Sequence, residues 1–464
     1  MMSTPVALAY LAASVLFIVG IRLISSPKSA RRGNLIAAAG MLAAFIATLP
    51  LLHGPGGGAV PGMNWLLIAA GIGVGLGLGA YGAYSVKMTA MPQMVALFNG
   101  LGGGAAALVA AMEFRHAEGR VLFATAMVFA GIIGAVSFSG SVIAFLKLEG
   151  KLEKPVTYPA QQIVNAALLL CIGALGAFLA LSSHGIGLFV VLGALALVLG
   201  VLMVLPIGGA DMPVVISLLN SFTGLAVAAD GFAISNVAMI IAGTLVGSSG
   251  TLLTLFMCKA MNRPVTNVLF GAFGKTVANG EATQCVLGTV KPIQADEAGL
   301  VLSVAQQVVI VPGYGLAVAQ AQHVIRELAD ELVRRGVEVS YAIHPVAGRM
   351  PGHMNVLLAE ANVPYEQLVE MEAINPQMER ADVCLVIGAN DVVNPAAHED
   401  PSSPIHGMPI IEAEKARTVI VLKRSMGKGF AGIENYLFYR DNCRMLFGDA
   451  KASLQALVAA VKAA

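Results

Sequence analysis

Hydrophobic residues fill the first 257 positions of the chain almost without interruption. About nine stretches are long enough to cross the hydrocarbon core of a membrane, which takes about 20 mostly apolar residues in a helix. They lie near 5–24, 35–53, 64–82, 91–112, 121–146, 162–182, 186–206, 213–232 and 235–257. Because only helices and closed barrels satisfy their backbone polar groups in lipid, the pattern predicts a polytopic α-helical membrane domain over residues 1–260.

Basic residues flank these stretches unevenly, and this predicts an orientation. If the N-terminus is outside, the outer loops carry Arg115 and Arg120. The inner loops and helix ends then carry Arg22, Lys28, Arg31, Arg32, Lys87, Lys147, Lys151 and Lys154. Positive charge gathers on the cytoplasmic side, and the absence of a basic residue before the first stretch argues against a cleaved signal peptide. We expect a multi-pass protein of the inner (plasma) membrane, with its N-terminus outside and its C-terminal domain in the cytoplasm.

Polar residues inside the apolar stretches are candidates for function, because they are expensive to place in lipid. Asp211 lies at the inner end of the eighth stretch, and Asn220 lies nine residues further on. Further polar residues within the stretches are Asn99, Ser139, Ser141 and Ser217. A column of such groups facing the bundle could carry a proton, and simple hydrogen bonding between helices is the alternative. None of the eight histidines lies deep in a predicted span.

Residues 261–300 have a mixed composition that predicts a linker. Beyond residue 300 the pattern changes to alternating strands and helices. Strands fit residues 308–311, 337–343, 383–387, 418–422 and 444–447. One amphipathic helix is expected after the turn at 312–319 and up to Arg335, with Val324, Leu328 and Leu332 on one face, and a final helix over 451–462. Alternation of this kind predicts a doubly wound parallel α/β sheet, Rossmann-like, over residues 301–464.

A glycine turn after the first of these strands indicates dinucleotide binding. Gly313 and Gly315 follow the strand and precede a helix, with Val318 where a third glycine would stand. Such a turn lets backbone approach a pyrophosphate at a helix N-terminus, although the motif alone is weak. The second strand ends at His344 rather than at the acid that would bind the ribose of NAD. A 2′-phosphate would need cations instead, and Lys423 with Arg424 at a strand end could supply them, unless they are only a solvated basic pair.

Two further loops at strand ends, 388–408 and 423–432, are long and rich in small residues, as functional loops often are. Asp391 in the first loop is a candidate titratable group beside a ligand, although a turn-forming aspartate is the commoner case.

Composition narrows the function further. The chain of 464 residues is 57% hydrophobic and 12% charged, with a net charge of +1, so a nucleic-acid partner is not expected. Its five cysteines are far apart and form no C-x-x-C pair, so we expect neither a disulfide framework nor a metal site.

Longer motifs carry a resemblance to a known family. They are GGADMPVVISLLNSFTG (208–224), VGSSG (246–250), CKAMNRP (258–264), PGYGLAVAQAQ (312–322), RMPGHMNVLL (349–358), IGANDVVNPAA (387–397) and KRSMGKGFAG (423–432). Over nearly its whole length the chain closely resembles the beta subunits of proton-translocating nicotinamide nucleotide transhydrogenases.

This resemblance implies reversible hydride transfer between NAD(H) and NADP(H), coupled to proton movement across the membrane. NADP(H) would bind to this chain, and NAD(H) to a separate alpha subunit that also adds membrane helices. The assembly would be a dimer of alpha–beta units in the lipid bilayer. The dinucleotide would lie reversed on the sheet relative to ordinary dehydrogenases.

The resemblance also implies roles for individual residues. Lys423, Arg424 and Ser425 would hold the 2′-phosphate, and Asp391 would lie near the nicotinamide and couple its redox state to protonation. The full set implied for the cofactor is Gly313, Tyr314, Gly315, Val318, Ala319, Arg349, Gly352, Gly388, Asn390, Asp391, Lys423, Arg424, Ser425, Gly429 and Ala431. The proton path would include Asn99, Ser139, Asp211 and Asn220.

One position departs from the family pattern. Asn99 aligns with a histidine that some members have in the fourth span. Either the titratable group comes from the partner, or water and Asn99 carry the path.

Two other functions remain open on the residues alone. One is a nucleotide-gated transporter or channel whose soluble domain only senses a ligand, and the other is a structural membrane anchor for a soluble reductase. No predicted span has a carbonyl filter or repeated halves, which argues against the channel. Only transhydrogenation needs a second nucleotide-binding chain nearby.

Overall fold

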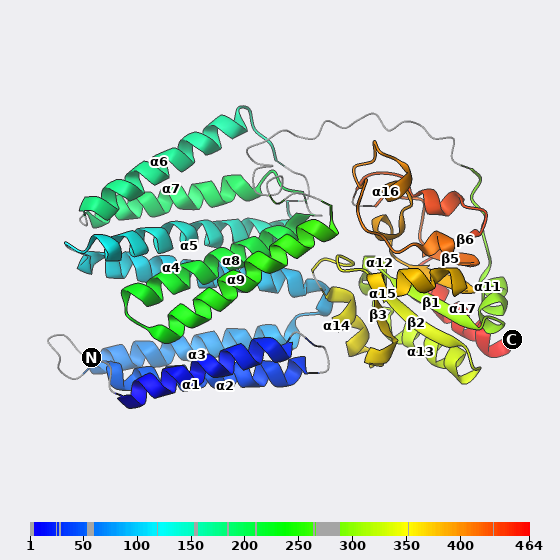
Figure 1. The fold of residues 1–464 in the computed structure, drawn as a ribbon, viewed down its shortest axis with the longest axis horizontal. Coiled ribbons are helices and arrows are strands. Elements are labelled where there is room, and N and C mark those ends of the chain that lie inside the picture. Colours follow the sequence, from blue (N-terminus) through cyan, green and yellow to red (C-terminus); the bar gives the residue numbers. More distant parts are fainter. Residues whose placement is uncertain are drawn as a thin grey trace. The chain divides into compact units, whose positions relative to one another are not determined.

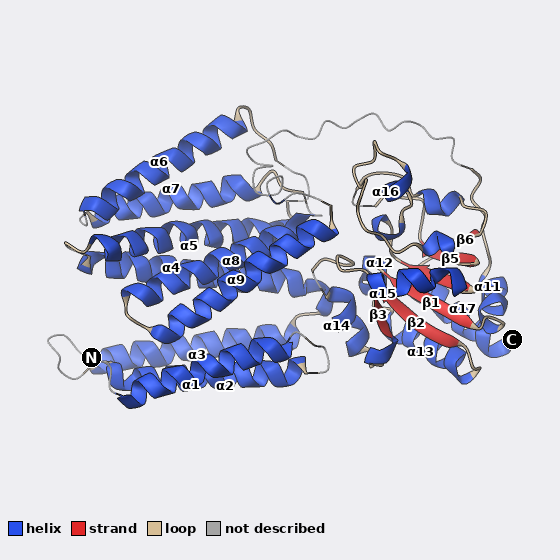
Figure 2. Cartoon of the chain, viewed as in Figure 1, coloured by secondary structure: helices blue, strands red, loops and turns tan. Residues whose placement is uncertain are grey.

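The structure, a computed structural model, describes residues 4–464 except 25, 27–28, 53–59, 118, 153–155, 183–184, 209–210, 263–264, 266–287, 351 and 430. The chain divides into two compact units, Met1–Ile207 with Val215–Leu253, and Gly208–Val214 with Thr254–Ala464. One consists of long helices, and the strands gather in the other (Figures 1 and 2). The boundaries expected from the sequence, at 260 and 300, stay predictions, and most of the expected linker lies outside the described residues.

Nine helices in the described part of the chain are long and apolar enough to cross a membrane. They are α1 (Thr4–Ile24), α2 (Ala30–Thr48), α3 (Gly62–Ser85), α4 (Met91–Glu113), α5 (Val121–Leu148), α6 (Gln161–Ser182), α7 (Ile186–Val204), α8 (Met212–Ala233) and α9 (Val237–Ala260). Each overlaps one of the stretches expected from the hydrophobic pattern, so the predicted polytopic helical domain is confirmed.

Glycines set the closest helix crossings. A Cβ added at Gly103 of α4 would lie 2.9 Å from the backbone oxygen of Gly134 in α5. One added at Gly224 of α8 would lie 2.8 Å from the oxygen of Gly243 in α9. Contacts this short exclude any side chain, so glycine is what lets these backbones meet. The glycines at 71–79 in α3 behave differently, because an added Cβ there meets no described atom within 4 Å.

The second unit contains a six-stranded sheet in the order β3-β2-β1-β4-β5-β6, with every neighbouring pair parallel. The strands are β1 (Gln307–Pro312), β2 (Glu338–Ile343), β3 (Leu368–Glu370), β4 (Val383–Ile387), β5 (Thr418–Lys423) and β6 (Cys443–Phe447). The predicted doubly wound parallel sheet is therefore confirmed. The short strand β3 was not predicted, because three partly exposed residues leave no apolar run to find.

Both faces of the sheet are buried, which is why its strands read as continuous apolar runs. Along β1, Val308 and Ile310 join one core, and Val309 and Val311 join the other. The first core is completed by α11 (Ala295–Ser303), α12 (Tyr314–Val318), α13 (Gln322–Arg334), α14 (His353–Glu360) and α17 (Ala450–Ala463). The second core includes α15 (Met371–Ile374), and α16 (Ala396–Glu399) belongs to a smaller third core.

Helix α11 begins within the range 261–300 that the sequence suggested as a linker and ends three residues beyond it. A Cβ added at its Gly299 would meet Ala460 of α17 at 2.5 Å, and Pro292 forms a parallel bridge with Met445 of β6. The residues from Pro292 onward therefore pack as part of the sheet unit.

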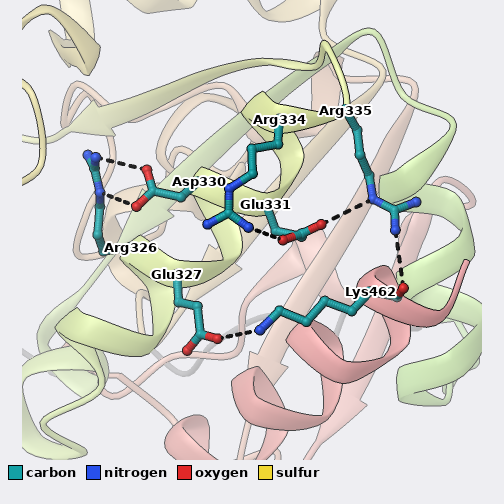
Figure 3. Close-up of polar contacts among 7 residues, drawn as sticks. All are labelled: Arg326, Glu327, Asp330, Glu331, Arg334, Arg335 and Lys462. Atoms are coloured by element: carbon teal, nitrogen blue, oxygen red, sulfur yellow. Dashed lines mark hydrogen bonds and ion pairs between the residues drawn. The ribbon is translucent and has the colours of Figure 1, made fainter.

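The amphipathic helix predicted to follow residues 312–319 and to end at Arg335 is confirmed as α13, and the predicted turn before it contains the short helix α12. Gln320 has a left-handed φ of 49° and separates α12 from α13. The buried face of α13 includes Leu328 and Leu332, as expected, but Val324 is only partly buried. Its polar face carries ion pairs such as Arg326 with Asp330, drawn in Figure 3.

Candidate functional site

A cavity of about 580 Å³ opens in the sheet unit where the strands end. Five loops line it, following β1, β2, β4, β5 and β6. Strands β2 and β4 lie on opposite sides of β1, so the sheet order reverses at β1. Ligands of open α/β sheets bind at this reversal, outside the carboxyl ends of the strands. The lining residues are Gly313, Tyr314, Gly315, Val318, Ala319, Val346, Ala347, Gly348, Gly388, Ala389, Asn390, Asp391, Val392, Leu422, Lys423, Arg424, Ser425, Gly427, Lys428, Gly429, Gly448, Asp449 and Ala450.

The glycine turn after β1 packs directly on the turn after β4. The backbone N–H of Gly313 donates to the carbonyl of Ile387 at 2.8 Å, and that of Gly315 donates to Gly388 at 3.0 Å. A Cβ added at Gly315 would lie 2.7 Å from the Cα of Gly388, which itself has a φ of +63°. These glycines therefore bring two turns together, and both N–H groups are already used, so they do not form a free cradle for phosphate.

Asp391 and Lys423 anchor the loop that follows β5. The backbone N–H of Ala431 donates to Asp391 Oδ2 at 2.9 Å, and Lys423 Nζ donates to the carbonyl of Gly427 at 2.5 Å. A Cβ added at Gly429 would lie 2.7 Å from the Asp391 carboxyl carbon, so only glycine lets the loop pass there. Burial lowers the pKa of Lys423, and the Asp391 carboxylate opposes that shift. The loop 423–432 is thus folded over a carboxylate and a partly buried ammonium.

Asn394 joins the loops after β4 and β5 from a fully buried position. Its Nδ2 donates to the carbonyl of Glu434 at 2.9 Å, and its Oδ1 accepts from the N–H groups of Ala396 and Tyr436, each at 3.1 Å. Asn435 adds a second link by donating to the carbonyl of Asn390 at 3.0 Å. Sequence reasoning missed both asparagines, because nothing in a sequence distinguishes a buried loop asparagine from a turn former.

The residue after β2 confirms that no acid stands where NAD would need one. His344 is 2% exposed, and its Nδ1 accepts from the N–H of Val346 at 3.2 Å. Its Nε2 lies 2.8 Å from the carbonyl of Pro409, which fixes the neutral tautomer with the proton on Nε2. Burial lowers the pKa of His344, in agreement with a neutral ring.

Cations gather on one side of the cavity. Arg424, Ser425 and Lys428 are exposed, and Lys423 is partly exposed beside them. Within the described residues, no hydrogen bond or ion pair occupies the Arg424 side chain. An unengaged guanidinium beside two ammonium groups suits a phosphate that accepts from several donors.

Three residues implied for the cofactor do not line the cavity, namely Arg349, Gly352 and Ala431. Arg349 lies behind it, with its guanidinium carbon 4.7 Å from the centre of the Tyr314 ring. Its backbone N–H donates to His353 Nδ1 at 3.1 Å, and Gly352 has a φ of +70° where α14 begins. Arg349 therefore reaches the cavity through Tyr314, whose burial raises its pKa while Arg349 opposes the shift.

Sequence reasoning missed two groups of lining residues, 346–348 and 448–450, whereas the other lining residues lie in or next to loops that the sequence had singled out. The available signal was positional, because each group directly follows the carboxyl end of a strand or lies in a loop that does.

A second polar cluster lies within the helical unit. Asn99 of α4 donates through Nδ2 to the hydroxyls of Ser141 and Ser137 in α5, at 2.9 and 3.3 Å. Ser137 also lies 2.6 Å from the hydroxyl of Thr223 in α8 and donates to the carbonyl of Leu219 at 2.8 Å. Three helices thus share one buried hydrogen-bond chain.

The other residues expected on the proton path lie outside this cluster. The Ser139 hydroxyl donates to the carbonyl of Ala135 in its own helix, at 3.1 Å, and lies against Gly200 of α7. Asp211 directly precedes α8, Asn220 lies within it, and both are partly exposed. Ser137 and Thr223 were not predicted, although the spacing of four between Ser137 and Ser141 was a signal that both face the same neighbour.

Comparison with known proteins identifies the family. The model of the NAD(P) transhydrogenase beta subunit family matches residues 6–460. Two relatives named NAD(P) transhydrogenase subunit beta, both from Rhodospirillum rubrum, are 50% identical over 467 aligned positions, covering 98% of this chain and 98% of each relative. The chain has the nine candidate spans, the parallel sheet and the cavity described above, and it belongs to the NAD(P) transhydrogenase beta subunit family.

Proposed function

We propose that the cavity binds NADP(H) and that the chain exchanges hydride between it and NAD(H) held by a partner alpha subunit. The cation cluster of Lys423, Arg424 and Lys428 at the cavity carries this proposal, because a 2′-phosphate is what distinguishes NADP from NAD. The neutral His344 at the end of β2 supports it, since an acid there would repel that phosphate and favour NAD. The volume of about 580 Å³ lies within the range of about 300 to 1,000 Å³ typical of ligand pockets.

Bound NADP(H) supplies or accepts the hydride at its nicotinamide ring. The residues of this chain bind and orient it, because hydride transfer needs alignment of two rings in a dry site rather than a protein acid. Lys423, Arg424 and Ser425 would hold the 2′-phosphate end. Asp391 would lie near the nicotinamide, where its hydrogen bond to Ala431 N–H ties its charge to the loop 423–432. A change in the protonation of Asp391 would weaken that bond and loosen the loop.

The proposed coupling moves protons across the membrane as hydride is transferred. One charge crossing 100 mV provides about 2.3 kcal/mol. Since about 1.4 kcal/mol changes a ratio tenfold, each proton could shift the nucleotide ratio by about 40-fold. Such coupling is a linkage between a proton site and a nucleotide site, so it would act through NADP(H) affinity and loop conformation.

The assembly and orientation proposed with this function follow the expectations from the sequence. The alpha subunit would carry the NAD(H) site and further membrane helices, and two alpha–beta units would form a dimer. The N-terminus of this chain would lie outside, and its sheet unit in the cytoplasm.

The test is equilibrium binding of NADPH and NADH, measured separately on the purified alpha–beta enzyme carrying Arg424→Ala. We expect NADPH binding to weaken by tenfold or more, because hydrogen bonds to a charged group contribute about 1.5–3 kcal/mol. Arg417→Ala is the matched control, because this arginine is exposed, pairs with Asp382 at 3.0 Å and does not line the cavity. It should leave NADPH binding unchanged. Preferential NADH binding at this cavity, or equal effects of the two variants, would contradict the proposal and favour a sensing domain.

A further inference from the structure

Asp230 lies in the last turn of α8 and is buried without a hydrogen-bond partner. Its exposed fraction is 1%, and neither carboxyl oxygen has a partner among the described residues. Lys147 of α5 is the contrasting case, because it is also buried but donates to the carbonyls of Leu205 and Ile207 at 2.6 and 2.7 Å. Among the nine described spans, Asp230 is the one buried carboxyl group.

The surroundings of Asp230 favour its neutral form. A buried ion without a partner costs several kcal/mol, so such a group holds a proton instead. The last turn of a helix carries the negative end of the helix dipole, which also disfavours a carboxylate. The charged group that acts on it from the packed helices is the carboxylate of Glu113, at the end of α4, and it has the same sign.

Asp230 lies on the same face of α8 as the polar cluster. Thr223 precedes it by seven residues, which is two turns or about 10 Å along the helix. Between Thr223 and Asp230, this face carries the apolar side chains of Ala226 and Val227. A proton can therefore pass between the two polar residues only along water molecules. Thr223 joins Ser137, and Ser137 joins Asn99, so a line of hydroxyl and amide groups runs from α4 to within two turns of Asp230.

The helix α8 therefore has a carboxyl group at each end. Asp211 precedes its first residue, and Asp230 stands 19 positions later, about 28 Å along a straight helix. This length is close to the thickness of the hydrocarbon core, about 30 Å. Asn99 cannot titrate in place of a histidine, but Asp230 can, and it belongs to this chain.

We propose that Asp230 binds and releases the translocated proton at the end of α8 opposite Asp211. This inference rests on the proposed proton coupling. On release, the O–H bond of the protonated carboxyl breaks, the proton passes to an accepting water molecule, and a carboxylate remains. Uptake reverses the step, and water molecules hydrogen-bonded to Thr223, Ser137 and Asn99 pass the proton onward, each breaking one O–H bond as it accepts the next proton, while the side chains only hold the water in place.

The experiment uses the complete alpha–beta enzyme in sealed vesicles, with proton uptake and hydride transfer recorded together. Asp230→Asn keeps the size of the side chain but removes the titratable group, and it should lower proton uptake and coupled turnover at least tenfold. NADPH binding should be retained, which separates this effect from misfolding. Asp230→Glu restores a carboxyl group and should recover most of the uptake. Glu113→Gln tests the neighbouring acid and should have a smaller effect.

The outcomes separate this inference from the function on which it rests. If the unmodified enzyme transfers hydride but moves no protons, the proposed coupling fails and the role of Asp230 fails with it. If the unmodified enzyme is coupled and Asp230→Asn is equally coupled, only the role of Asp230 is overturned. Infrared spectroscopy of the unmodified enzyme is a second measurement that does not need a variant to fold well. A protonated carboxyl band that changes during turnover, and that shifts in Asp230→Glu, would support the assignment. A band that never changes would overturn it.

Discussion

Two buried polar side chains in each region of the molecule differ in how completely they are hydrogen-bonded. In the sheet unit, buried Asn394 uses its Nδ2 once and its Oδ1 twice, and buried His344 uses both ring nitrogens. In the helical unit, Asn99 Oδ1 has no hydrogen-bond partner among the described residues, and neither carboxyl oxygen of Asp230 has one. Satisfied groups hold loops in one conformation, whereas groups with spare capacity can exchange partners. Across these four side chains the bonded groups lie in the sheet unit and the groups with spare capacity in the helical unit, although His353 of the sheet unit, which is also buried, leaves its Nε2 without a partner among the described residues.

Glycine also serves the two regions differently. In the sheet unit, Gly313 and Gly315 bring two turns into contact beside the cavity. In the helical unit, Gly103 and Gly224 bring whole helices together, while the stripe at 71–79 faces no described atom. The same residue therefore shapes a binding site in one region and a helix crossing in the other, and only the three-dimensional neighbours show which.

The largest predicted effect comes from replacing Gly313 of the sheet unit by alanine, which adds one methyl group. A Cβ at Gly313 would lie 2.4 Å from the Cα and N of Ala389, so Gly313→Ala must push the two turns apart. We expect a loss of about 3 kcal/mol, equivalent to about 100-fold weaker NADPH binding, because overpacking displaces the backbone that lines the cavity. Calorimetric titration of the alpha–beta enzyme with NADPH measures this change.

Gly75→Ala in α3 is the matched control, because a Cβ there meets no described atom within 4 Å. Alanine is also the better helix former, so no loss of stability or binding is expected. Wild-type NADPH affinity in Gly313→Ala would show that the two turns are not in tight contact, and the comparison of glycines would then fail.

Much of the fold was predictable because buried helices and strands appear in the sequence as runs of apolar residues. The nine spans and the strands β1, β2, β4, β5 and β6 all appear as apolar runs, since lipid or helices cover them on every side. The short helix α12 left no such pattern, because its five residues are too few for a helical period and the left-handed φ of 49° that follows it falls on Gln320 and not on a glycine. Strand β3 was missed for a similar reason, because it pairs with β2 through only three partly exposed residues.

A second prediction compares one residue type in the two regions. Lys147 of α5 is buried and donates to two carbonyls, whereas Lys462 of α17 pairs with Glu327 at 2.6 Å with both side chains about half exposed (Figure 3). We expect Lys147→Met to destabilise the helical unit by about 2 kcal/mol, because the hydrogen bonds of a charged donor outweigh its burial cost. Lys462→Met should change the stability of the sheet unit by less than about 1 kcal/mol, since exposed ion pairs are screened.

Thermal unfolding of the full chain in detergent measures both variants. The fluorescence of Trp65, the single tryptophan, reports on the helical unit, and NADPH fluorescence reports on the sheet unit. Equal losses of thermal stability in the two variants would mean that Lys147 contributes no more than a surface lysine. The hydrogen bonds from Lys147 to its two carbonyl acceptors would then not stabilise the helical unit.

The sequence predicted those parts of the candidate site that lie in loops directly after strands. The turn at 313–319 and the loops after β4 and β5 all line the cavity, because parallel strands deliver their carboxyl ends to one edge. The hydrogen bonds of Asn394 and Asn435 were not predictable, since they join loops 40 or more residues apart in the chain. In the helical unit, Ser139 and Ser141 were the serines expected in the fifth span. Ser139 lies against α7, whereas Ser141 and the unpredicted Ser137 accept hydrogen bonds from Asn99.

The smallest predicted effect is a loss of stability of the sheet unit at low pH. Among the described residues, the buried histidines are His344 and His353, and burial lowers the pKa of both. Below the ordinary value of 6.5, the unfolded chain takes up protons that the folded rings do not, so stability falls as the pH drops below about 6.5 and is fully present above it. Each group contributes a slope of at most about 1.4 kcal/mol per pH unit.

Hydrogen exchange across residues 343–353, corrected for the intrinsic effect of pH, measures this loss locally. Exchange should rise as the pH falls, because protonation of His344 removes the Nδ1 acceptor of the Val346 N–H. His344→Gln lacks the titratable ring, so its exchange should depend less steeply on pH, even if it is faster throughout. An unchanged slope in this variant would assign the acid sensitivity to His353 or to the carboxylates. The conformation of the loop after β2 would then not depend on a neutral His344, and the contrast between the bonded side chains of the sheet unit and Asp230 would lose one of its two examples in that unit.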